Sequence, residues 1–207
     1  MYKKNILSPS IPAFWENYYQ SGEIGWDLGG PTPIFNQWIK TCNKPLTICI
    51  LGAGNGWDAI NFALYGHNIT AVDFAKSPVQ NMKRQARNYG IKMNVLHRDI
   101  FSLSNIFTSH FDVVLEYTCF CAISPVNRRN YIEMVQHILK PNGKLVGLLF
   151  PVEMNKTNVE PPYPIDLDKT IKLFNEYLYL IEQKVSTLTV SSRTGREVFV
   201  IFKKHAN

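Results

Sequence analysis

The chain has 207 residues, of which 45% are hydrophobic and 18% charged, which describes one folded domain with a full core and excludes a disordered chain. Its net charge of +6 comes from scattered Lys and Arg residues, which favours a solvated basic surface over a nucleic-acid-binding face. No apolar stretch approaches the ~18 residues of a membrane span or the length of a signal peptide, so we expect a cytoplasmic protein.

The first 41 residues predict two short helices separated by an irregular loop. Residues 1–11 are expected to be a loose lead-in, and residues 12–20 (PAFWENYYQ) a helix with Pro in its first turn. Residues 22–33 (GEIGWDLGGPTP) contain too much Gly and Pro for regular structure, so Trp26 is expected on a loop. A second helix is predicted over residues 34–41.

The stretch ICILGAGNGW at residues 48–57 predicts a buried strand, a glycine turn and the start of a helix. Glycines suit such a turn because side chains would keep the backbone away from a ligand. A second strand, ITAVD, ends at Asp73, about 20 residues beyond the glycines, the spacing at which an acid can receive ribose hydroxyls. Together these features predict a nucleoside site without saying which nucleoside binds.

The remaining pattern alternates strands and helices and then stops alternating. Helices are predicted over 77–89 and 127–139, and strands over 93–96, 111–116 and 144–150. This alternation predicts a parallel sheet with right-handed crossovers. A helix over 165–174 then precedes strands over 177–190 and 198–202, which are joined by a turn at 191–195 (SSRTG). The sheet is therefore expected to end in an antiparallel pair.

Five separated segments now agree with one family: Phe14-Trp15, WDLGGPTP at 26–33, GAGNG at 52–56, YTCFCAI at 117–123 and PPY at 161–163. Together they resemble the thiopurine S-methyltransferase superfamily, especially its plant-type thiol and halide methyltransferases. The resemblance runs from about Phe14 to Phe202. It implies an α/β fold of the Rossmann-like class I methyltransferase type, with a mostly parallel seven-stranded sheet, an antiparallel C-terminal hairpin and helices on both faces.

The resemblance also implies an organisation of the single domain, residues 1–207. Residues 10–41 would form a lid over the cofactor, residues 46–150 the cofactor-binding core, and residues 151–207 the acceptor-side loop and hairpin. S-adenosyl-L-methionine would be the methyl donor, leaving S-adenosyl-L-homocysteine. The acceptor would be a small soft nucleophile, namely a thiol, bisulfide, thiocyanate or halide, and the protein a monomer without nucleic-acid or membrane partners.

Site residues follow from the resemblance position by position. The donor's sulfonium end would be lined by Trp15, Tyr19 and Trp26, although Tyr19 stands where the plant proteins usually carry tryptophan. The other expected donor contacts are Gly52 and Gly54 at the methionine part, Asp73 at the ribose, Asp99 with Ile100 at the adenine, and Glu116, where relatives usually carry aspartate. Tyr163 and Trp26 would align acceptor and methyl, with no general base and no metal.

The chemistry is consistent with these residue types. Aromatic faces attract a cationic sulfonium by about 0.5–2 kcal/mol each when desolvated. Methyl transfer is an in-line displacement, so catalysis is largely alignment. An anionic acceptor needs no general base, whereas a neutral thiol needs one or reacts through its thiolate fraction. No histidine lies in a motif that marks it as that base, which favours an anion or an acidic thiol as acceptor.

Several residues also have a purely structural interpretation. Trp15 and Tyr19 are spaced as a core-facing helix stripe, Asp73 can cap the next helix, and Asp99 can belong to a turn. Cys119-x-Cys121 is expected to be packing, since a zinc site needs further ligands. Three other functions stay open: an amine or nucleic-acid methyltransferase, suggested by EPPY although it follows the wrong strand; a noncatalytic adenosine-nucleoside-binding protein; and a nicotinamide-dependent oxidoreductase.

Overall fold

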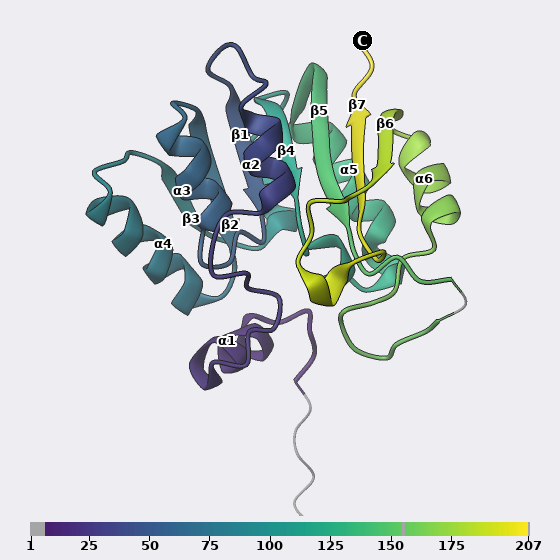
Figure 1. Cartoon of the computed structure of the whole chain (residues 1–207), viewed down its shortest axis with the longest axis horizontal. Coiled ribbons are helices and arrows are strands. Elements are labelled where there is room, and N and C mark those ends of the chain that lie inside the picture. The colour runs from purple at the N-terminus through teal and green to yellow at the C-terminus, as the bar shows by residue number, and fades with distance from the viewer. Residues whose placement is uncertain (1–6, 155, 207) are drawn as a thin grey trace, which may run out of the picture.

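The computed structural model describes residues 7–154 and 156–206, so residues 1–6 of the expected lead-in lie outside the described residues. Its centre is a seven-stranded sheet in the order β3-β2-β1-β4-β5-β7-β6 (Figure 1). The strands are β1 (Thr47–Leu51), β2 (Asn68–Asp73), β3 (Asn94–His97), β4 (Phe111–Glu116), β5 (Leu139–Leu149), β6 (Tyr179–Val185) and β7 (Val198–Lys203). Only β7 runs against its neighbours, as the predicted C-terminal hairpin requires, and the predicted fold class is confirmed.

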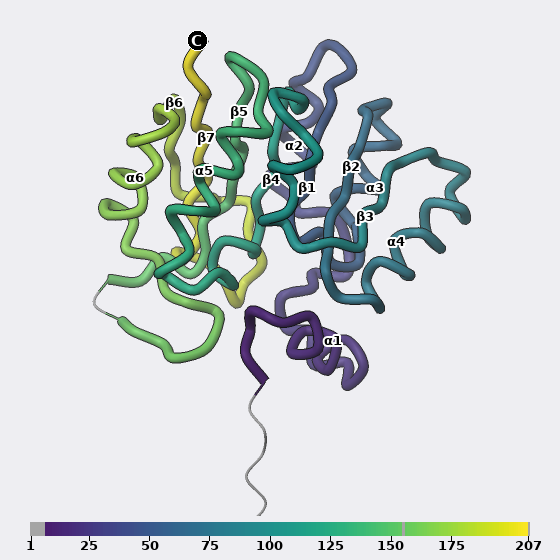
Figure 2. Tube along the Cα trace, turned by 180° about the vertical axis from the view of Figure 1, so that it is seen from behind, coloured from purple at the N-terminus to yellow at the C-terminus, as the bar shows by residue number. Residues whose placement is uncertain are grey.

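The apolar side chains of β1 point alternately to the two faces of the sheet, so both faces must be covered. Cys49 and Leu51 face one core cluster, while Ile48 and Ile50 face the other, as the two-residue period of a strand dictates. One cluster includes residues of α2 (Pro33–Ile39), α3 (Trp57–Leu64) and α4 (Lys76–Asn88). The other includes residues of η1 (Ile100–Asn105), α5 (Arg128–Ile138) and α6 (Leu167–Asn175), and Figure 2 shows α5 on this side of the sheet.

Two strand boundaries differ from the prediction by five residues each. β5 begins at Leu139 rather than at the predicted residue 144, but its pairing with β4 is irregular at this end. Phe111 pairs with Leu139 and Val113 with Lys144, so β5 has extra residues between the two pairs. The predicted turn therefore survives as an irregularity inside the strand, with Asn142 at φ +63°. β6 ends at Val185 rather than at residue 190, and residues 186–197 form a long loop containing the single turn η4 (Ser191–Arg193).

The N-terminal segment, residues 10–41, lies across one end of the sheet up to Thr32, whereas its last helix, α2, packs on one face. Its first helix, α1 (Pro12–Ser21), lies beyond the carboxyl ends of the parallel strands (Figure 1). The strand order reverses between β1 and β4, and open α/β sheets bind their ligands beside such a reversal. Within the described residues, no helix is both long and apolar enough to cross a membrane.

Candidate active site

The glycine turn after β1 has a backbone that other residues would distort. Gly52, Gly54 and Gly56 have φ values of +56°, +55° and +82°, which side chains rarely adopt. A Cβ on Gly52 would lie 3.0 Å from Cys119 Sγ, and one on Gly56 only 2.4 Å from Met82 Cγ. The turn thus packs tightly against its surroundings, and at Gly52 and Gly54, which are partly exposed, it offers only backbone, which is what close approach to a ligand requires.

Asp73 at the end of β2 is tied to this turn. Its Oδ2 accepts a hydrogen bond from Gly54 N (3.0 Å), its Oδ1 accepts one from Ala75 N (2.9 Å), and the residue is 7% exposed. Burial raises the pKa of Asp73 to about 6. Each carboxylate oxygen has a second lone pair after these bonds, so the pair can still accept two hydroxyl groups.

The three predicted aromatic residues lie together above the turn. The Trp26 ring centroid is 5.4 Å from that of Trp15 and 5.6 Å from that of Tyr19, both edge-on. Trp26 Nε1 donates to the Tyr19 hydroxyl at 3.3 Å, and that hydroxyl would be 3.2 Å from a Cβ on Gly54. Tyr18, which the sequence did not single out, completes the group at 5.7 Å from Trp26. The structure therefore brings residues of α1, the following loop and the glycine turn into one place.

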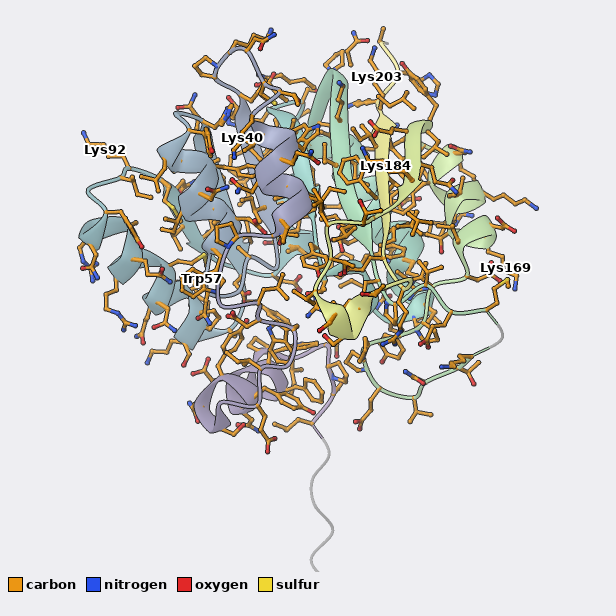
Figure 3. The ribbon with its side chains drawn as sticks, viewed as in Figure 1. Lys40, Trp57, Lys92, Lys169, Lys184 and Lys203 are labelled. Atoms are coloured by element: carbon orange, nitrogen blue, oxygen red, sulfur yellow. The ribbon has the colours of Figure 1, made fainter. Side chains whose placement is uncertain are left out.

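Two carboxylates of the N-terminal segment attach it to the core. Glu16 on α1 accepts from Ser77 N (2.9 Å) and Ser77 Oγ (2.5 Å) at the start of α4. Asp27 accepts from Trp57 Nε1 (2.8 Å) and from the Asn55 side chain within the glycine turn. Figure 3 shows Trp57 at the start of α3, facing the N-terminal segment. Neither attachment was foreseen, because each joins residues far apart in the sequence.

A third attachment of the N-terminal segment fixes the end of the loop at residues 22–33. Asp58, in the first turn of α3, accepts from Thr32 N (2.8 Å) and Thr32 Oγ1 (2.7 Å). Burial raises the pKa of Asp58 to about 6. A cavity of about 60 Å³ lies between this loop and the glycine turn, and Trp26, Gly52 and Tyr117 are among its lining residues. A larger hollow of about 310 Å³ lies elsewhere, between α4 and β3.

Asp99 and Ile100 follow β3, next to the strand that carries Asp73. Asp99 is exposed and caps η1, with its Oδ1 accepting from Phe101 N at 3.0 Å. Ile100 is buried in the core. Arg98 N donates to the carbonyl of Asp73 at 3.0 Å, so the two strand ends are directly linked. The turn role left open by the sequence is therefore present, and the Asp99 side chain remains accessible beside Asp73.

Glu116 lies deeper than its predicted role suggests. It is 1% exposed, and its two oxygens accept from Phe120 N (2.8 Å) and from the Tyr131 hydroxyl (2.6 Å). Burial raises its pKa to about 7. Both oxygens thus already have donors inside the protein, one in the loop after β4 and one on α5. Cofactor contact by Glu116 stays a prediction.

The cysteines of the loop after β4 behave as packing residues. Burial raises the pKa of Cys119 well above that of a free thiol, and Cys121 Sγ donates to the carbonyl of Thr118 at 3.2 Å. Within the described ranges, no group of three or more His, Cys, Asp or Glu residues is arranged to hold a metal ion.

Tyr163 is held against the same loop. Its N–H donates to the carbonyl of Cys121 at 2.7 Å, and its own carbonyl accepts from Arg128 Nη2 at 3.3 Å. The Arg128 guanidinium lies 4.8 Å from the centroid of the Phe120 ring. The segment that carries Tyr163 is therefore fixed beside the end of β4, and no sequence pattern indicated the part that Arg128 plays.

Positive charge is spread over the surface, as the sequence suggested. Figure 3 shows labelled lysines on separate parts of the molecule, at Lys40 after α2, Lys92 before β3, Lys169 on α6, Lys184 on β6 and Lys203 on β7.

Several solved structures with this fold are methyltransferases. The 1,6-didemethyltoxoflavin-N1-methyltransferase of Burkholderia thailandensis, solved with S-adenosylhomocysteine, superposes with a TM-score of 0.81 at 16% identity, covering 99% of this chain and 93% of that one. The N-methyltransferase NodS of Bradyrhizobium japonicum, also solved with S-adenosylhomocysteine, gives 0.65 at 13% identity over 94% and 88%. The fold is that of the class I S-adenosylmethionine-dependent methyltransferases.

The chain belongs to the thiopurine S-methyltransferase (TPMT) family, whose model matches residues 11–206. The resemblance stated from the sequence is thereby confirmed, and with it S-adenosylmethionine as cofactor. A probable thiol methyltransferase 2 of Arabidopsis thaliana is 27% identical over 96% of this chain and 88% of its own length. Thiocyanate methyltransferase 1 of the same plant is 26% identical over 92% and 84%.

Proposed function

We propose that the chain moves a methyl group from S-adenosylmethionine to a small soft nucleophile, namely a thiol, bisulfide, thiocyanate or halide. The observation that carries this proposal is its similarity over more than nine-tenths of its length to proteins named thiol and thiocyanate methyltransferases. Bound at this site, the donor supplies an electrophilic methyl group on a positively charged sulfur. The protein's own part is to hold the two reactants in line and to keep water out.

The donor-binding roles follow the geometry of the glycine turn. Backbone at Gly52 and Gly54 would approach the methionine part, and the free lone pairs of Asp73 would receive the ribose hydroxyls. Asp99 and Ile100 would contact the adenine at the neighbouring strand end. Glu116 would act mainly by holding the loop after β4 in place, since its oxygens already accept hydrogen bonds from groups inside the protein.

The aromatic group would cover the sulfonium. Trp15 and Tyr19 each pack edge-on against Trp26, and a cation beside this group would gain attraction from each desolvated face that it contacts. Residues 10–41 would thus serve as the lid, residues 46–150 as the cofactor-binding core, and residues 151–207 as the acceptor side. Trp26 and Tyr163 would align the acceptor with the methyl group.

The titratable groups at the turn favour an acceptor that is already anionic. Burial raises the pKa of Tyr19 and of Cys119 far above neutrality, so neither holds a negative charge that would remove a proton. Asp73 accepts two backbone hydrogen bonds and is assigned to the ribose. Iodide, thiocyanate and bisulfide need no deprotonation, and an aromatic thiol reaches its thiolate form in solution near neutral pH.

The test is donor turnover against iodide, thiocyanate, bisulfide, an aromatic thiol, a primary amine and an RNA pool, with S-adenosylhomocysteine formation and the methylated product both measured. Product from at least one of the first four, with none from amine or RNA, supports the proposal. Methylation of amine or RNA alone would replace it with the alternative enzyme class. A Tyr163→Phe variant measured in parallel separates an effect of the hydroxyl from an effect of the ring.

A further inference from the structure

The loop between β6 and β7 contains a buried ion pair. Arg193 is 5% exposed and Glu197 is 1% exposed, and Arg193 Nη1 lies 3.8 Å from Glu197 Oε1. The Tyr117 hydroxyl bridges them, since it donates to Glu197 Oε1 and accepts from Arg193 Nη1. Thr189 Oγ1 donates to the second oxygen of Glu197. Each oxygen of the negative partner therefore has a hydrogen-bond donor, which a buried carboxylate needs.

The other nitrogen of the same guanidinium reaches the N-terminal segment. Arg193 Nη2 donates to the carbonyl of Trp26 at 2.9 Å and to the carbonyl of Gly25 at 3.3 Å. The guanidinium also lies over two rings, 4.9 Å from the centroid of Phe150 and 5.2 Å from that of Tyr117. One side chain thus joins the end of β4, the C-terminal hairpin and the loop that carries Trp26.

This arrangement requires arginine rather than a generic cation. The planar guanidinium directs Nη1 at the Tyr117 hydroxyl, 3.8 Å from Glu197 Oε1, and Nη2 at two backbone carbonyls on the other side. A lysine ammonium is a single point and cannot occupy both positions at once. Because the acceptors on the loop are carbonyls, the contact fixes the backbone of Trp26 independently of its side chain.

We infer that Arg193 is a positioning residue that holds Trp26 over the donor, with Glu197 and Tyr117 setting the direction of its guanidinium. The inference rests on the proposed function, in which Trp26 covers the donor. It makes the loop at Gly25 and Trp26 a further point of attachment of the N-terminal segment, anchored from the acceptor side, and it assigns the C-terminal hairpin a part in donor binding.

Hydrogen exchange of the ligand-free protein, with peptides covering residues 22–30 and strands β1 and β4, tests this directly. In Arg193→Lys, the ion pair with Glu197 can persist while the hydrogen bonds to the carbonyls of Gly25 and Trp26 are lost. The amide exchange rate at residues 22–30 should therefore rise about tenfold, while the exchange rates of the strands stay unchanged. The matched control is Arg196→Gln. Arg196 lies in the same loop, 5.1 Å from the Phe150 ring, and pairs with Glu153 at 2.7 Å, but no hydrogen bond joins its side chain to Gly25 or Trp26 in the described structure. It should leave exchange at 22–30 unchanged.

A second variant covers the case in which Arg193→Lys does not fold. Tyr117→Phe keeps both charges but removes the bridging hydroxyl, so exchange at 22–30 should rise by a smaller factor. Unchanged exchange at 22–30 in a folded Arg193→Lys, or in Tyr117→Phe if the lysine variant is unfolded, would overturn the inference. So would equal increases in the segment and in the strands, which would indicate a merely structural role.

Donor binding supplies the functional readout. Calorimetry should show an S-adenosylhomocysteine affinity about tenfold weaker in Arg193→Lys and unchanged in Arg196→Gln. If none of the panel acceptors were methylated, the acceptor proposal would fail while the exchange and binding results still decided the role of Arg193. Weakened binding that is equal in both variants would count against the positioning role.

Discussion

Asp73→Asn is expected to weaken S-adenosylhomocysteine binding strongly at pH 8 and much less at pH 5. Asp73 keeps one free lone pair on each oxygen after bonding Gly54 and Ala75, and a hydrogen bond to a charged acceptor contributes on the order of 1.5–3 kcal/mol. That corresponds to roughly 10- to 150-fold in affinity at pH 8. Since burial raises its pKa to about 6, about nine-tenths of the carboxyl is protonated at pH 5 in the free protein, and the wild-type advantage shrinks about tenfold.

Loss of stability would not account for this result. The folded pKa of about 6 lies above the ordinary 3.8, so ionised Asp73 opposes folding by about 3 kcal/mol above pH 6, and this opposition disappears as the pH falls toward 4. Asparagine removes the charge but can accept only one of the two backbone N–H groups, which costs about 1–3 kcal/mol. The two effects offset each other at pH 8, so the variant should remain folded.

Calorimetric titration of both proteins at pH 5 and pH 8 is the assay, and thermal unfolding confirms that each is folded. Asp112→Asn is the matched control, because Asp112 is on β4 and bonds Thr47 N and Lys140 rather than the glycine turn. An unchanged affinity of folded Asp73→Asn at pH 8 would remove Asp73 from the ribose site. A loss of equal size at both pH values would show that its ionisation is irrelevant to binding.

Three further outcomes are expected. Trp26→Leu should weaken binding of the charged donor more than that of S-adenosylhomocysteine, by a factor of about 2–30 from the lost cation attraction, and equal losses by calorimetry would mean that Trp26 is only an apolar cover. At saturating donor, turnover with thiocyanate should be flat from about pH 7.5 to 9, whereas turnover with a neutral thiol should rise toward the thiol's own pKa; a bell-shaped thiocyanate profile would reveal a protein base. Gly56→Ala should lower the free energy of unfolding by about 1–3 kcal/mol more than Gly66→Ala, because both have positive φ but only Gly56 would place a Cβ against Met82, at 2.4 Å; equal losses in denaturant unfolding would contradict that packing.

The parts of the fold that the sequence predicted are those with local signals. The apolar run before Gly52, the carboxylate that closes the next strand and the alternation of strands with helices are all readable within short windows, and they predicted the mostly parallel sheet. The loop at residues 186–197 was partly mistaken for strand because its TLTV stretch is rich in β-branched residues. There the chain forms an irregular loop around the buried Glu197 and Arg193, and propensity gives way to tertiary contacts.

The site was predictable only in part, for a related reason. Asp73 and the aromatic residues stood out through spacing and resemblance, whereas Glu16 with Ser77, Asp27 with Asn55, and Arg193 with the Trp26 carbonyl are pairs that only the folded chain brings together. In the sequence, Arg193 is one of many scattered cations, and nothing local distinguishes a buried arginine from a solvated one. Glu116 shows the converse, since its position at a strand end suggested a ligand contact while its oxygens bond within the core.

The central claim is that the donor lies on the glycine turn beneath the aromatic group, and a crystal structure with S-adenosylhomocysteine tests it most directly. The account predicts both ribose hydroxyls within about 2.6–3.2 Å of the Asp73 carboxylate, the adenine beside Asp99 and Ile100, and the sulfur facing Trp26 above Gly52. A bound ligand whose ribose lies away from Asp73, or whose sulfur faces solvent rather than Trp26, would contradict it.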